Sequence, residues 1–344
     1  ITRGNVIQHS ITSTYMLDET TGYIKIRNFG ENTYPEFLAA LAQLSQQRAE
    51  NLVIDLRDNT GGLLQAVSLM ANEFLDKGQL IVYTEGRRSP REDIVADGRG
   101  AYKQMPLVVL INEISASASE IFAGAIQDND RGRIVGRRSF GKGLVQEPIY
   151  FTDGSGVRIT IARYYTPSGR CIQKPYSADY EYDIYKRYTD GEMTDADSIK
   201  VNKDEEYHTL GGRTVYGGGG IVPDVFVPID TTKVTSFYMQ CTKKATTMRY
   251  ASAYFDSHKS ELSSIEDYAA LLRYLDNAGL ESGFLDFAAS QDGIRPVNVD
   301  EWKESAVYMM PQIRALIGRY SKLGDKAYYH IFLEIDETYK KALN

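Results

Sequence analysis

The sequence predicts an α/β core, followed by a β-rich flank and a helical C-terminal region. Between residues 50 and 137, short apolar runs alternate with amphipathic helical segments. This alternation is typical of a parallel sheet joined by right-handed crossovers. From about Val145 the sequence changes to strand-like alternation, and from about Ala245 apolar residues recur at helical spacing. These three patterns define the fold class.

The elements expected along the chain follow from periodicity and from turn residues. A strand at 22–27 precedes a helix that begins near Thr33, and the next strand covers 52–56. A helix from Leu64 ends near Gly78. Two apolar strands at 80–83 and 107–111 come next, and a helix covers 115–127. Residues 176–220 are polar and rich in tyrosine and acidic residues, so we interpret them as a long surface excursion.

Composition excludes several classes of protein. The chain has 344 residues, of which 42% are hydrophobic, and this content is sufficient for a core and argues against intrinsic disorder. The net charge of −7 argues against nucleic acid or an anionic membrane as the main partner. No apolar stretch approaches the roughly 18 residues that a membrane-spanning helix needs. Two cysteines, Cys171 and Cys241, make neither a disulfide framework nor a metal-like spacing.

The sequence predicts neither a cofactor nor a metal ion. No pair among the four histidines has zinc-ligand spacing. The run Gly217–Gly220 lacks the Lys-Ser/Thr that follows a phosphate-binding loop. Residues 128–130 resemble the start of a calcium loop, but no closing glutamate follows them.

A run of small residues at 115–119, followed by Glu120, is the first candidate for chemistry. Small residues at a strand-to-helix junction allow close approach of a substrate backbone, and the first turn of a helix leaves free N–H groups. A serine hydroxyl beside such an amide is what acyl transfer requires. The alternative is an ordinary helix cap, because Ser117 and Glu120 have capping-box spacing. The residues alone do not decide between Ser115 and Ser117.

Lys142 is the second candidate, because glycines flank it in a loop between two expected strands. A lysine can deprotonate a serine when burial lowers its pKa. Gln146 follows four residues later and could accept a hydrogen bond from the amine. One alternative is an exposed hairpin lysine. Another is a Ser-x-x-Lys pair with Ser139, but the intervening glycine argues against the helical turn that this pair needs.

Five motifs in order resemble those of the C-terminal processing peptidases, also called tail-specific proteases. They lie at residues 55–62, 112–120, 139–146, 165–170 and 220–224. Their order and spacing match over roughly residues 15–230, about two thirds of the chain. Ile114 is a departure, since many relatives carry glycine there.

The resemblance implies a ClpP/crotonase-like core and a serine endopeptidase that cuts proteins near their C-termini. It places the nucleophile on Ser117, the general base on Lys142 and an orienting role on Gln146. The amide of Ala118, with one from Gly61 or Gly62, would form the oxyanion hole. The implied partners are protein or peptide C-terminal tails, with a regulatory or adaptor protein also compatible, and not nucleic acid.

The resemblance also implies a domain organisation. Residues 1–14 would be a lead-in, the exit of a peptide-binding PDZ module missing from this chain. Residues 15–244 would form the catalytic core and residues 245–344 a helical region. Family membership implies a place in the cell envelope or periplasm. The alternative function is a catalytically idle peptide-binding or scaffolding protein, but the presence of both Ser117 and Lys142 favours the enzyme.

Overall fold

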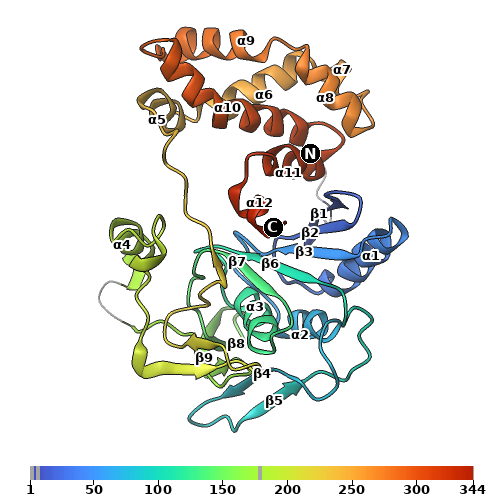
Figure 1. The fold of residues 1–344 in the computed structure, drawn as a ribbon, viewed down its shortest axis with the longest axis vertical. Helices are drawn as coiled ribbons and strands as arrows, with labels where there is room; N and C mark the ends of the chain where they lie inside the picture. The colour runs from blue at the N-terminus through green and yellow to red at the C-terminus, as the bar shows by residue number, and fades with distance from the viewer. Residues whose placement is uncertain (1–3, 5–7, 177–179, 344) are drawn as a thin grey trace. The chain divides into compact units, whose positions relative to one another are not determined.

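A computed structural model describes residues 4, 8–176 and 180–343. The chain divides into two compact units (Figure 1). The first, which we call the core unit, comprises Ile1–Pro228 and Lys340–Asn344. The second, the helical unit, comprises Ile229–Tyr339. The fold class expected from the sequence is confirmed, since the core unit mixes helices with sheets and helices make up the second unit.

A six-stranded sheet forms the centre of the core unit, in the order β1-β2-β3-β6-β7-β12. Its strands are β1 (Ile11–Met16), β2 (Thr21–Ile26), β3 (Asn51–Asp55), β6 (Leu107–Ile111), β7 (Arg133–Gly136) and β12 (Val225–Phe226). In this sheet β2, β3, β6, β7 and β12 pair in parallel, and β1 pairs antiparallel with β2. Residues 11–14 of the expected lead-in therefore belong to an edge strand of this sheet.

Three crossover helices pack on the sheet: α1 (Thr33–Gln46), α2 (Leu64–Asn72) and α3 (Ala118–Asp128). Their apolar side chains share one core with the strands, and Phe74 joins them, with its ring 6.1 Å from those of Phe37 and Phe122. All residues of α3 are buried, because this helix is enclosed by its neighbours. The start of α3 is consequently held by packing on every side.

The β-rich flank is a second sheet of four antiparallel strands in the order β5-β4-β9-β8. The strands are β4 (Leu80–Glu85), β5 (Glu92–Val95), β8 (Leu144–Tyr150) and β9 (Gly156–Tyr165). Strands β8 and β9 form a hairpin whose far end is exposed, and β8 is an edge strand.

The polar segment after β9 contains short elements and is tied to the core. Its elements are three short 3-10 turns (Tyr180–Tyr182, Ala196–Ser198 and Lys203–Glu205), α4 (Asp183–Thr189), β10 (Glu206–His208) and β11 (Thr214–Tyr216). Arg187 and Glu192 are buried and form an ion pair at 2.7 Å. The Arg187 guanidinium also donates to the carbonyl oxygens of Arg138 (2.6 Å) and Ser139 (3.0 Å), just before Lys142. Part of the expected surface excursion therefore braces the loop that carries the candidate lysine.

The helical unit has its own apolar core. Its helices are α5 (Ser236–Lys243), α6 (Thr246–Ser257), α7 (Lys259–Leu262), α8 (Tyr268–Asp276), α9 (Leu280–Phe287), a π-turn (Ala288–Asp292), α10 (Val299–Tyr320) and α11 (Gly324–Leu333), and α12 (Glu337–Ala342) follows. The Phe237 ring of α5 lies 5.9 Å from that of Trp302. The boundary expected at residue 244 therefore falls inside this unit, because α5 packs with the helices that follow it.

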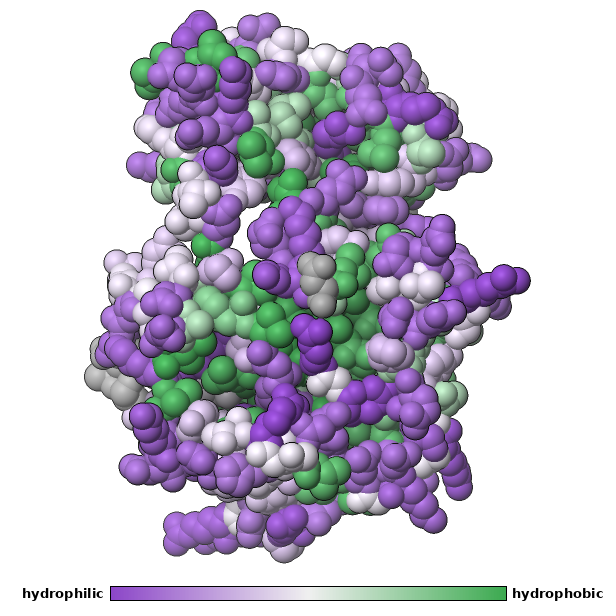
Figure 2. Space-filling view, in the orientation of Figure 1, coloured by the Kyte–Doolittle hydropathy of each residue, from purple (hydrophilic) through white to green (hydrophobic). Residues whose placement is uncertain are grey.

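The visible surface is mostly hydrophilic. Figure 2 shows hydrophilic residues over most of the visible face, with hydrophobic residues gathered over the middle of the core unit. Within the described residues, no helix is both long enough and apolar enough to cross a membrane.

Candidate active site

A cavity of about 630 Å³ brings together five of the residues predicted for catalysis, Gly61, Gly62, Ser117, Lys142 and Gln146. They come from separate parts of the chain. The loops after β3 and β7 carry the glycines and the lysine, and the turn after β6 carries the serine. These three strands are parallel neighbours. Their carboxyl ends therefore lie on one edge of the sheet, where α/β proteins usually bind ligands.

Ser117 has an unusual backbone conformation at the start of α3. Its φ of 57° and ψ of −116° lie in a region that side-chain-bearing residues rarely adopt. Such a turn costs free energy and persists only where the surroundings impose it. In α/β-hydrolases a strained strand-to-helix turn exposes the nucleophilic serine.

The neighbouring serines have structural roles. Ser115 and Ser119 are fully buried. The Ser115 hydroxyl donates to the carbonyl oxygen of Leu56 at 2.9 Å, and that of Ser119 donates to the carbonyl oxygen of Asn59 at 2.8 Å. Of the three serines, Ser117 is the one that lines the cavity.

Glu120 joins the backbones of the serine and lysine segments. One carboxylate oxygen, Oε2, accepts the N–H groups of both Ser117 and Lys142 at 2.9 Å. The other, Oε1, accepts the Gly141 N–H at 2.7 Å and the Ser139 hydroxyl at 2.5 Å. Burial raises the pKa of Glu120, although all four hydrogen bonds favour its charged form. Ser117 and Glu120 form the capping box that their spacing predicts, and the Glu120 carboxylate also holds the loop that contains Lys142.

Tyr164 makes a second connection between the same two residues. Its hydroxyl donates to the carbonyl oxygens of Ser117, at 3.1 Å, and Lys142. The side chain is buried, and burial together with the charge of Glu120 raises its pKa well above the ordinary value. Ser117 and Lys142 are thus tied through their N–H groups by one side chain and through their carbonyl groups by another.

The glycines beside Lys142 are required by close packing. Gly141 has a φ of +88°, and a Cβ on Gly143 would lie 2.9 Å from the backbone nitrogen of Gln173. The Gln173 side chain accepts the Gly143 N–H at 2.9 Å. Lys142 itself is partly buried and lines the cavity. This is the close backbone packing that the flanking glycines indicated.

Ser139 does not share the cavity with Lys142. It is fully buried, and its oxygen accepts the N–H of Ile221 at 2.7 Å while its hydroxyl donates to Glu120. Residues 139–143 contain no helical turn. The geometry that a Ser-x-x-Lys pair needs is therefore not formed here.

Gln146 lies on β8 at the edge of the cavity. Its amide nitrogen donates to the Thr160 hydroxyl at 3.4 Å. Lys142 and Gln146 are both described, and no hydrogen bond joins their side chains in this structure. The orienting role of Gln146 remains a prediction.

Gly61 and Gly62 differ in whether the backbone N–H group has a hydrogen-bond acceptor. The Gly61 N–H donates to the side-chain oxygen of Asn59 at 2.8 Å. The amides of Gly62 and Ala118 have no acceptor among the described residues. A Cβ on Gly61 would lie 2.7 Å from Ser117 Cβ and 2.9 Å from the Ala118 nitrogen. Gly61 therefore keeps space open beside the serine, and Gly62 has the free amide.

A buried charged cluster supports the loop that contains these glycines. Asp55 is fully buried and accepts hydrogen bonds from Lys25 (3.1 Å), Arg57 (2.7 Å) and the Tyr23 hydroxyl (2.8 Å). Burial opposes the charged form, but the charges of Arg57 and Lys25 outweigh it and hold the pKa of Asp55 well below its usual range. The cluster anchors the start of the loop at residues 57–62.

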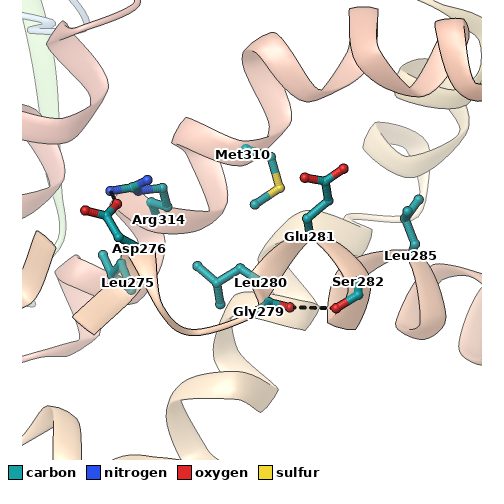
Figure 3. Close-up of a pocket in the computed structure, with 9 residues that line it drawn as sticks. All are labelled: Leu275, Asp276, Gly279, Leu280, Glu281, Ser282, Leu285, Met310 and Arg314. Carbon is teal, nitrogen blue, oxygen red and sulfur yellow. Dashed lines mark hydrogen bonds and ion pairs between the residues drawn. The ribbon is translucent and has the colours of Figure 1, made fainter. Parts of the chain in front are cut away.

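Another cavity, of about 540 Å³, lies in the helical unit (Figure 3). An ion pair of 2.6 Å between Arg314 and Asp276 lies on one side of it. Its one serine, Ser282, donates to the carbonyl oxygen of Gly279 at 3.1 Å. None of the residues predicted for catalysis lines this cavity.

Comparison with known proteins agrees with the motifs. Residues 20–184 match the model of peptidase family S41. The carboxyl-terminal-processing proteases of Synechocystis sp. and Picosynechococcus sp. are each 46% identical over 156 residues, which is 45% of this chain and 36% and 37% of theirs. The chloroplastic C-terminal processing peptidase of Tetradesmus obliquus is 43% identical over 153 residues, 44% of this chain and 33% of its own.

Among solved structures, the photosystem II D1 C-terminal processing protease is 31% identical with a TM-score of 0.47, and the match covers 66% of this chain and 50% of that one. The chain spans about a third of the length of the curated relatives that it matches. The resemblance predicted from the five motifs is confirmed. Residues 20–184 are thus similar to the serine-type peptidases of family S41, and specifically to the carboxyl-terminal-processing proteases.

Proposed function

We propose that this chain is a serine endopeptidase that cleaves proteins near their C-termini, with Ser117 as nucleophile and Lys142 as general base. The observation that carries the proposal is the strained conformation of Ser117 in a cavity that Lys142 also lines. A strained serine backbone is costly to maintain, and such residues cluster at catalytic sites.

The reaction would follow the two stages of acyl transfer. Lys142 Nζ takes the proton of the Ser117 hydroxyl as Oγ attacks the carbonyl carbon of the scissile bond. The lysine then gives this proton to the leaving amine, and an acyl-enzyme ester remains on Ser117. A water molecule attacks the ester, the lysine removes its proton, and the serine regains that proton as the acid product leaves.

Charge on the substrate oxygen is stabilised by backbone amides in this scheme. The N–H groups of Ala118 and Gly62 have no hydrogen-bond acceptor among the described residues. Gly61 lies next to both, because a Cβ added to it would meet the Ala118 nitrogen. A preorganised donor of this type contributes a factor of about 10²–10³ to kcat. The free amides and the dyad belong to the same sheet edge, so one bound carbonyl could reach both.

Protein tails as substrates form part of this proposal, because they follow from the resemblance to the curated relatives. The cell-envelope location and a regulatory partner also belong to the proposal, and they rest on the resemblance of the five motifs alone. The orienting role of Gln146 is retained as a prediction. The alternative is that the chain binds peptides without cleaving them, and the experiment below distinguishes the two.

The test incubates the chain with an unstructured protein and maps new C-termini by mass spectrometry. Ser117→Ala is expected to remain folded and to produce no cleavage. Lys142→Arg is expected to be as inactive as Lys142→Ala, because arginine does not lose its proton. The matched controls are Ser155→Ala and Lys77→Arg, which change residues that do not line the cavity.

Near-normal turnover by Lys142→Arg would show that the residue supplies charge or packing and is not the base. Turnover by Ser117→Ala would place the nucleophile elsewhere. Peptide binding by the unaltered chain without any cleavage would favour the catalytically idle alternative.

A further inference from the structure

The active-site cavity is lined by basic residues and by no acidic ones. Besides the proposed general base Lys142, its basic lining residue is Arg158, and no acidic side chain lines it. The chain as a whole has a net charge of −7. An arginine in a cavity without carboxylates, in a protein that is acidic overall, favours a negatively charged group on the ligand.

Arg158 is placed at the cavity by the pairing of β9 with β8. Arg158 lies opposite Pro148, and Thr160 lies opposite Gln146, so these side chains share one face of the hairpin. Gln146, Pro148 and Arg158 all line the cavity that Ser117 also lines. Arg158 therefore lies on the face of the hairpin that borders the candidate nucleophile.

The guanidinium of Arg158 has no partner among the residues that the structure describes. The structure contains no ion pair or hydrogen bond between this side chain and any described residue, whereas the arginines that brace the core, such as Arg57 and Arg187, are paired with carboxylates. A planar guanidinium presents two parallel N–H donors that match a carboxylate. An exposed arginine that lines the cavity without a partner is thus free to bind one.

We propose that Arg158 determines specificity by binding a carboxylate of the substrate. This inference rests on the proposed function, in which substrates are protein tails that end in an α-carboxylate. Arg158 precedes Tyr164, whose hydroxyl contacts Ser117, by six positions, or at most roughly 20 Å at about 3.3 Å per residue, since a β-bulge interrupts the strand. An extended substrate has the same rise, so the carboxylate lies roughly four to eight residues from the scissile bond once the reach of the arginine is included.

The experiment measures binding in the Ser117→Ala background, so that no peptide is cleaved. The probe is a fluorescein-labelled peptide of about ten uncharged residues, made with a free C-terminal carboxylate or as the amide. A third peptide is amidated and carries one internal glutamate. Kd is measured by fluorescence anisotropy for the background protein and after Arg158→Gln, Arg158→Lys or Arg163→Gln. Arg163 is the matched control, because it is an exposed arginine of the same strand that does not line the cavity.

The background protein is expected to bind the free acid about fivefold more tightly than the amide, a modest preference because Arg158 is exposed. Arg158→Gln should bring this ratio to about one, Arg158→Lys should retain part of it, and Arg163→Gln should leave it intact. A preference for the internal glutamate over the terminal acid would identify a side chain as the source of the carboxylate.

Equal Kd values for all three peptides, or a preference that survives Arg158→Gln, would overturn the inference. These results are separable from failure of the proposed function. Cleavage by the unaltered chain without a carboxylate preference removes only the role of Arg158. A preference that depends on Arg158, without any cleavage, removes only the peptidase.

Discussion

Glu120→Gln is the most informative single substitution in the core unit. The side chain keeps its size, but one of its two acceptor oxygens becomes an NH₂ group. The carboxylate has four donors, the N–H groups of Ser117, Gly141 and Lys142 and the hydroxyl of Ser139. The single side-chain oxygen of glutamine can accept hydrogen bonds from only two of these donors, in either orientation of the amide.

The structure sets the size of the effect. Two buried donors lose their acceptor, and each unsatisfied buried group costs about 1–3 kcal/mol. The free energy of unfolding should therefore fall by about 2–6 kcal/mol. When the NH₂ group faces the backbone N–H groups of Ser117 and Lys142, the two residues are also expected to separate. A misplacement of about 1 Å can reduce kcat by about 10²-fold.

The assay combines urea unfolding with steady-state kinetics on a peptide that the unaltered chain cleaves. Glu113→Gln is the matched control, because Glu113 is part of an ion pair with Arg137 and contacts neither candidate catalytic residue. The control is expected to change stability by less than about 1 kcal/mol. Measurements are made where Glu120→Gln remains folded, so that the loss of kcat is not a loss of folded protein.

Stability and kcat for Glu120→Gln that both match those of Glu113→Gln would refute this reasoning. A loss of stability with normal kcat would show that the carboxylate supports the fold without positioning Ser117 and Lys142.

Three further predictions follow from other contacts. Gly61→Ala should abolish turnover and lower the melting temperature, because its Cβ would lie 2.7 Å from Ser117 Cβ; kinetics and calorimetry test this. Asp55→Asn should lower the free energy of unfolding at pH 7 by about 3–5 kcal/mol. In urea titrations this difference should shrink as the pH falls below about 4, because a carboxyl with a depressed folded-state pKa loses its stabilisation there. Burial, together with the charge of Lys326, lowers the pKa of His330 to about 4, so the helical unit should lose stability as the pH falls from about 6.5 to 4. Fluorescence of the single tryptophan, which lies in this unit, should report the loss, and His330→Gln should reduce it; an unchanged pH dependence in that variant would contradict the assignment.

Local patterns in the sequence determined the fold class and the segments that carry the candidate site. Alternating strands and helices, a run of small residues before a helix and a lysine between glycines are all readable over a few neighbouring positions. The reason is physical: periodicity records which face is buried, and glycine records where a backbone must pack closely or turn with positive φ.

The tertiary structure decided which members of those segments face the cavity. Ser115 is distinguished from Ser117 by a hydrogen bond to Leu56, 59 positions away in the chain. Tyr164 reaches Ser117 across 47 positions, and Glu120 reaches Lys142 across 22. No local pattern encodes these partners, because each depends on the loops after β3, β6 and β7 meeting at one edge of the folded sheet.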